Sequence, residues 1–166
     1  MALIARISQS HSIRDFRKAA RLRFHEARRA VEAGDLLIGI YLAGYAAEMI
    51  LKATYFQIAG WKPTDAITLQ DLQTAKADAM TLGIAWKGRN LHDVTQWAEL
   101  LIQKRKVQGT PYSKELASSL VGQVARLYSN WRETLRYHGN RPRVAEVVVT
   151  LEAVEWLLIN ASRLAR

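Results

Sequence analysis

The chain of 166 residues contains no cysteine, so disulfide bonds and thiolate metal sites are excluded. It has three prolines, and its nine glycines occur singly, which excludes a glycine-rich phosphate loop. The longest uncharged apolar stretch, residues 36–47, ends at Glu48 and is too short to cross a bilayer. The first ten residues lack a charged region followed by a long apolar run. We therefore expect no secretory signal, no membrane association and a cytoplasmic location.

The net charge of +9 is distributed unevenly. Residues 1–30 hold eight basic side chains against Asp15 and Glu26, a balance of +6, whereas the remainder holds 16 against 13, a balance of +3. Such asymmetry favours a polyanion or an acidic protein as partner. The charge alone does not distinguish the two.

Apolar residues recur at helical spacing through most of the chain and never alternate with period two for long enough to form a strand. The predicted helices cover residues 13–33, 36–59, 68–82, 91–106, 113–136 and 143–164. Ser12, Asp35 and Asn90 precede three of them and are predicted N-caps. We expect one all-α domain over residues 1–166, an up-and-down bundle of four to five main helices with its core at about 13–164.

The first predicted helix is strongly amphipathic. Its apolar side includes Phe16 and Phe24, and its other side is basic. The basic residues predicted to contact nucleotide or RNA are Arg14, Lys18, Arg21 and Arg28. The plain alternative is that this face is only solvated.

The second predicted helix is apolar on nearly all sides, yet it carries Glu48 and Lys52 one turn apart on the same face. Tyr41, Tyr45 and Tyr55 extend that face at helical spacing. Buried charges are unfavourable unless they are paired. The stripe therefore either borders a polar cleft that binds a nucleotide or RNA, or forms an ion pair within the bundle.

Metal sites are not expected. A di-iron bundle needs Glu-x-x-His motifs, and no glutamate here has histidine three residues later. The four histidines are dispersed without an i,i+4 pair, which argues against zinc. We therefore predict neither a metal nor a cofactor.

Three short motifs follow one another along the chain. They are Ala-Gly-Tyr-Ala-Ala-Glu-x-x-Leu-Lys-Ala at residues 43–53, His92-Asp93, and Leu-Arg-Tyr at residues 135–137. In this order they resemble the HEPN family (higher eukaryotes and prokaryotes nucleotide-binding). The resemblance spans roughly residues 13–164. It departs from the family pattern at Val94, where leucine is usual, and at His138, where proline is common.

The resemblance implies a helical bundle and two kinds of function. Some HEPN proteins are non-catalytic partners of small nucleotidyltransferases in toxin–antitoxin pairs. Others are metal-independent ribonucleases that carry Arg-x(4–6)-His, a spacing matched by Arg132 and His138 and also by Arg6 and His11. In that chemistry His138 is the base or acid, and Arg132 or Arg136 stabilises the phosphorane charge.

Three hypotheses follow. The first is a homodimeric nucleotide- or RNA-binding module that works with a nucleotidyltransferase-type partner, with Glu48, Lys52, Arg136 and Tyr137 at its site. The second is an endoribonuclease toxin that uses Arg132 and His138. The third is a non-catalytic protein-interaction domain. His92 at a helix start is interpreted as a structural contact, and Asp93 as a response to the helix dipole.

Overall fold

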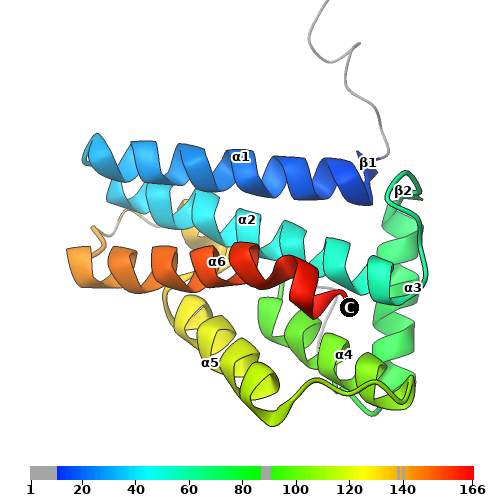
Figure 1. Cartoon of the computed structure of the whole chain (residues 1–166). Helices are drawn as coiled ribbons and strands as arrows, with labels where there is room; N and C mark the ends of the chain where they lie inside the picture. Colours follow the sequence, from blue (N-terminus) through cyan, green and yellow to red (C-terminus); the bar gives the residue numbers. More distant parts are fainter. Residues whose placement is uncertain (1–10, 87–90, 138, 140) are drawn as a thin grey trace, which may run out of the picture.

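The computed structural model describes residues 11–86, 91–137, 139 and 141–166, and within them the chain is almost entirely helical (Figure 1). The predicted all-α bundle is confirmed. Its α-helices are α1 (Ile13–Glu32), α2 (Leu36–Ile58), α3 (Leu69–Thr81), α4 (Val94–Val107), α5 (Lys114–Asn130) and α6 (Val144–Leu164). A 3₁₀-helix, η2 (Glu133–Tyr137), precedes α6.

One small sheet was not expected. β1 (His11–Ser12) pairs antiparallel with β2 (Ala66–Ile67), with His11 opposite Ile67 and Ser12 opposite Ala66. The prediction of no strand was wrong here because a two-residue pairing has no periodicity to detect. The pairing ties the start of α1 to the segment that leads into α3.

α1 and α2 form a tight antiparallel hairpin (Figure 1). Ser12 caps α1 as predicted: its Oγ accepts from the Asp15 amide (3.2 Å), and Asp15 Oδ2 accepts from the Ser12 amide (3.0 Å). Gly34 has a φ of +87°, the left-handed conformation that lets the chain turn after α1. Asp35 is the N-cap residue of α2, as predicted, but its side chain makes no capping hydrogen bond.

α2 is the central helix of the bundle. α1 lies along one side of it, α6 runs beside it, and α4 and α5 lie across it from α1, while α3 stands crosswise at one end (Figure 1). Of the described helices, α2 alone is long and apolar enough to span a membrane, but most of its apolar stretch is buried inside the bundle. That burial is typical of the core helix of a soluble protein.

Two predicted helix boundaries were wrong. α4 begins at Val94, with Asp93 as N-cap accepting from the amides of Thr95 (2.9 Å) and Gln96 (3.4 Å). The predicted cap, Asn90, lies outside the described residues. α5 ends at Asn130 instead of residue 136, because Trp131 is extended (φ −127°, ψ 136°).

A buried-to-surface polar cluster joins α2, α3 and α4. The Tyr55 hydroxyl donates to Asp78 Oδ2 (2.8 Å), and Lys104 Nζ lies 2.6 Å from the same oxygen. Burial and the bond to Asp78 raise the pKa of Tyr55. Burial raises the pKa of Asp78, but the hydrogen bonds from Lys104 and Tyr55 outweigh it, so the net pKa lies below its ordinary value. This cluster fixes the crosswise helix to the bundle.

Candidate functional site

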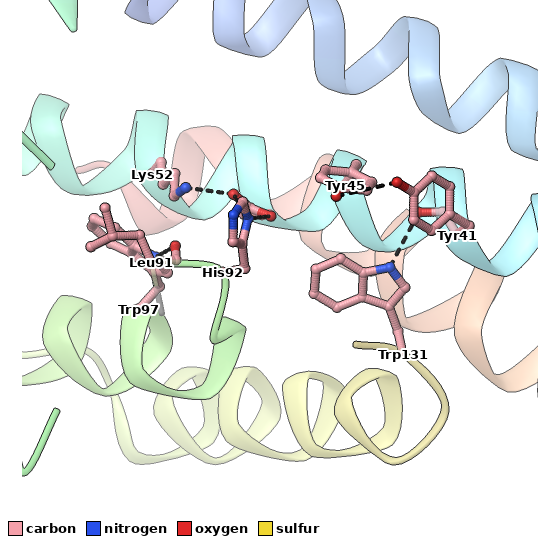
Figure 2. Close-up of polar contacts among 8 residues, drawn as sticks. Tyr41, Tyr45, Lys52, Leu91, His92, Trp97 and Trp131 are labelled. Atoms are coloured by element: carbon pink, nitrogen blue, oxygen red, sulfur yellow. Dashed lines mark hydrogen bonds and ion pairs between the residues drawn. The ribbon is translucent and has the colours of Figure 1, made fainter. Parts of the chain in front are cut away.

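The charged pair on α2 is buried. Glu48 is 5% exposed and Lys52 4%, and Lys52 Nζ lies 2.5 Å from Glu48 Oε1 (Figure 2). Because the two residues are one turn apart, α2 itself aligns the pair. Lys52 Nζ also lies 5.6 Å from the centroid of the Trp97 ring, which comes from α4. The ammonium is thereby enclosed between the carboxylate and an aromatic face.

His92, just before α4, reaches the same carboxylate. Its Nδ1 lies 3.0 Å from Glu48 Oε1 and 2.9 Å from Oε2. The His92 side chain is 43% exposed, whereas that of Glu48 is 6% exposed. The cluster therefore holds a carboxylate inside the protein and an imidazole at its surface.

The charges around Glu48 determine whether the carboxylate or the His92 imidazole carries the hydrogen in this contact. Burial raises the pKa of Glu48, but the hydrogen bond from His92 and the charge of Lys52 outweigh it, so the net pKa lies below its ordinary value. An ionised carboxylate only accepts hydrogen bonds, so His92 Nδ1 must carry the proton. This contact fixes the orientation and the tautomer of the imidazole ring.

The residue after His92 connects the loop to α5. Asp93 Oδ2 accepts from the Tyr128 hydroxyl (2.9 Å), while its Oδ1 caps α4. Burial, followed by the bond to Asp93, raises the pKa of Tyr128. The guanidinium of Arg132 lies over the Tyr128 ring, 3.1 Å from its centroid, and donates to the Trp131 carbonyl (2.7 Å). Arg132 is therefore joined to the His92-Asp93 motif through one aromatic ring.

Trp131 holds this corner against α2. Its indole Nε1 donates to the Tyr41 carbonyl (3.2 Å), and its ring meets Tyr45 edge-to-face at 5.7 Å (Figure 2). A Cβ added at Gly44 would lie 2.1 Å from the Trp131 ring, so only glycine admits the indole there. Tyr45 in turn lies 6.3 Å from the His92 ring, edge-to-face. Aromatic contacts thus run without a break from Trp131 to the imidazole.

The predicted site residues fall into two groups. Glu48 and Lys52 pair on α2, Arg132 lies over the Tyr128 ring of α5, and Tyr137 lies in η2, 73% exposed. Arg136 is in η2, but its side chain is outside what the structure describes, as is His138. The basic residues of α1 lie elsewhere. α1 packs on the opposite side of α2 from this cluster, so it does not contribute to the site (Figures 1 and 2). Those residues are Arg14, Lys18, Arg21 and Arg28.

Sequence reasoning underestimated His92, Tyr128 and Trp131. The structural contact expected for His92 is made to Glu48, 44 residues away. Trp131 is fully buried, and its ring also contacts Tyr45. One available signal was the spacing of Tyr128 and Arg132, four apart, which brings a ring and a guanidinium together near a helix end.

These residues do not form a group of ligands suited to a metal ion. Across the part of the chain that the structure describes, no three histidine, aspartate or glutamate side chains group closely enough to hold an ion. Glu48 and His92 form a pair only, and the carboxylate is already neutralised by Lys52. The chemistry available is proton transfer at an imidazole, stacking on tyrosine rings and charge pairing with Arg132.

No protein-family model, curated protein or solved structure matches this chain significantly.

Proposed function

We propose that this protein is a nucleotide- or RNA-binding helical bundle of the HEPN type, and that its binding surface is formed by His92, Tyr45, Tyr128 and Arg132. One observation carries the proposal: His92 Nδ1 lies 2.9 Å from Glu48, so motifs 44 residues apart meet at a hydrogen bond. The third segment, at Arg132, reaches the same region through Tyr128 and Asp93. Glu48 and His92 belong to two of the three motifs on which the family resemblance rests, and Arg132 lies three residues before the third motif, residues 135–137.

The composition of this surface suits nucleic acid. Tyrosine and histidine rings stack on bases of any sequence, an interaction of about 1–3 kcal/mol per base. Arginine binds phosphate through its planar array of N–H donors. Lys52 neutralises Glu48, which removes the repulsion that a buried carboxylate would exert on a phosphate.

An open surface favours an extended strand over an enclosed small molecule. His92 is 43% exposed, and Tyr45, Tyr128 and Arg132 are half-buried. A more apolar hollow of about 380 Å³ lies away from them, beside Phe16, Leu22 and Met49. RNA is therefore the preferred ligand of the two.

The test is binding of labelled single-stranded RNA, measured by fluorescence anisotropy. We expect Arg132→Gln and His92→Gln each to weaken binding about tenfold, the loss of one stacked or charged contact. Arg126→Gln is the matched control, because Arg126 is an exposed arginine of α5 paired with Glu152. The proposal fails if both site variants bind RNA as tightly as the control.

Metal-independent RNA cleavage by Arg132 and His138 is the second candidate. On one continuous helix the two residues would point about 120° apart. α5 ends at Asn130, before Arg132, so that constraint does not apply. With chelator present, the protein should cut single-stranded RNA and His138→Ala should not; undiminished cutting by the variant would refute this candidate.

The partners remain part of the proposal. The HEPN resemblance is the support for a homodimer and for a nucleotidyltransferase-type partner in the cytoplasm. Light scattering coupled to size-exclusion chromatography tests the dimer directly. Capture of an acidic protein that survives nuclease treatment, without any RNA binding, would instead support a protein-interaction domain.

A further inference from the structure

The exposed face of α1 carries five basic side chains in one line. They recur at alternating steps of four and three residues, which places them on one side of the helix over about 21 Å. We call this set the basic stripe: Arg14, Lys18, Arg21, His25 and Arg28. All five are exposed, and within the described residues none lies within ion-pairing distance of a carboxylate.

The nearby acidic residues are engaged elsewhere. Asp15 is held by the Ser12 cap, and Glu26 pairs with Arg23. Glu32, four residues after Arg28, is the next residue on the same face, so the run of basic side chains ends at Arg28. Like charges one turn apart on a helix repel each other, so the stripe lowers the stability of α1 unless an anion neutralises it.

A hollow adjoins the stripe. It has a volume of about 300 Å³ and is lined by Arg14, Arg17, Lys18 and Arg21 together with Ile13 and Pro63. Arg17 is anchored at its edge by a hydrogen bond to Gln57. Burial, and then the charge of Arg21, lowers the pKa of Arg17. The N-terminal half of the stripe is therefore a concave surface rather than a row of isolated side chains.

We propose that the basic stripe binds the phosphodiester backbone of a nucleic acid strand, with the hollow receiving one phosphate. The ligand offers negative charges at regular intervals, and the stripe offers positive charges at regular intervals along a straight rod. Backbone contacts of this kind need no apolar anchor and read no sequence.

Other polyanionic surfaces fit less well. Protein interfaces are centred on buried aromatic or aliphatic anchors. The stripe contains no such anchor, and the apolar hollow beside Phe16, Leu22 and Met49 meets it at Lys18 alone. Insertion into an anionic membrane needs an apolar helix face, but that of α1 is buried against the bundle through Ile13, Ala20 and Phe24. A phosphate backbone remains the ligand whose chemistry matches the stripe.

The stripe is separate from the surface of His92 and Arg132. α1 packs on α2 at Gly39, where an added Cβ would lie 2.3 Å from Val31, and the Glu48 cluster lies on the other side of α2 (Figure 2). The inference therefore does not depend on the proposed function.

The experiment compares two triple variants with the same loss of charge. The stripe variant is Lys18→Gln, Arg21→Gln and Arg28→Gln. The control variant neutralises three exposed cations on other helices or at their ends, Lys106→Gln, Lys114→Gln and Arg163→Gln. Binding of labelled single-stranded RNA, and of DNA with the same sequence, is measured over a range of salt concentrations.

We expect the stripe variant to bind both strands at least about tenfold more weakly at physiological salt. The slope of log affinity against log salt should fall by about 2, since each phosphate contact on a single strand contributes about 0.7. The control variant should bind like the parent protein. A third variant that keeps the charges, Lys18→Arg, Arg21→Lys and Arg28→Lys, should retain affinity and separates loss of charge from loss of folding.

Equal affinity and equal salt slope in the stripe and control variants would overturn the inference. So would an unchanged affinity for RNA combined with lost binding to anionic vesicles or to an acidic peptide. If Arg132→Gln and His92→Gln bind normally while the stripe variant does not, the proposed site fails and the stripe stands. The opposite pattern removes the stripe and keeps the site.

Discussion

Two polar clusters lie along the same face of α2, one around Glu48 and one around Tyr55, and they are built in different ways. Around Glu48, the carboxylate is buried, its cation Lys52 comes from the same helix, and an imidazole lies at the surface. Around Tyr55, the phenol is buried and the carboxylate of Asp78 is 31% exposed, with its cation supplied by α4. Each cluster combines an acid, a base and an aromatic ring.

The difference lies in which group meets solvent. In the Tyr55 cluster it is a carboxylate held by two hydrogen bonds, which suits a structural tie between helices. In the Glu48 cluster it is an imidazole, the side chain that transfers protons near neutral pH. Similar residues on one helix thus give a structural contact near its C-terminal end and a candidate site near its middle.

Removing the carboxylate of Glu48 in one variant and that of Asp78 in another should give the largest difference in stability between the two clusters. Glu48→Ala leaves Lys52 buried without its partner, so we expect a loss of about 3–5 kcal/mol in the free energy of unfolding. Asp78→Ala removes a partly exposed pair and should lower it by only about 1 kcal/mol. Urea denaturation monitored by circular dichroism measures both, and equal losses would contradict the comparison.

Filling the space beneath Trp131 should have the next largest effect. Gly44→Ala places a methyl group against the indole ring, and overpacking of this kind lowers the free energy of unfolding by about 1–3 kcal/mol. Gly122→Ala is the control, because nothing lies within 4 Å of its added Cβ. In the middle of α5 that change should stabilise the protein by about 0.5–1 kcal/mol. Thermal melting curves that shift the same way for both variants would count against the packing account.

The pH dependence of stability should identify the contribution of Glu48. Its pKa in the folded protein is lowered, so its contribution is complete above the unfolded value, about 4.3 for glutamate, and is lost as pH falls through the folded value. Each unit of lowering contributes about 1.4 kcal/mol. Glu48→Gln should therefore flatten the acid limb of the stability profile. Asp78→Asn should also flatten the acid limb, since the pKa of Asp78 is lowered as well. An acid limb unchanged in Glu48→Gln would show that Glu48 is not the ionised, low-pKa carboxylate described above.

The smallest effect is expected at Tyr128. Tyr128→Phe keeps the ring under Arg132 but removes the hydroxyl that donates to Asp93, which should lower the free energy of unfolding by about 0.5–1.5 kcal/mol. Tyr112→Phe, which loses a bond to the Leu164 carbonyl at the far end of the bundle, is the control for the chemical change. RNA affinity should fall in Tyr128→Phe alone, because only that hydroxyl holds the His92 loop against α5.

Periodicity along the chain predicted the helices well, because each follows from local spacing. The apolar face of α1 and the Ser12 cap needed no knowledge of the rest of the molecule. The helix ends were less predictable. Asp93 caps α4 with one carboxylate oxygen and accepts from Tyr128 of another helix with the other. α5 ends at Asn130, where Trp131 turns into a space left by Gly44.

The same limit applies to the candidate site. The i,i+4 spacing was enough to pair Glu48 with Lys52. Neither spacing nor composition could place His92 on that carboxylate, since the contact depends on how α4 packs against α2. The basic stripe was visible in the sequence, but its position on the other side of α2 from the site was not.

The order of elements along the chain bears on how the molecule folds. The α1–α2 hairpin joins sequence neighbours, and such contacts form early because they close short loops. Trp131 meets the Tyr41 carbonyl across 90 residues, and that closure is much slower. We therefore expect the α1–α2 hairpin, which carries the basic stripe, to fold first during synthesis. The contact between Trp131 and Tyr41 can form only later, once α5 and Trp131 have left the ribosome.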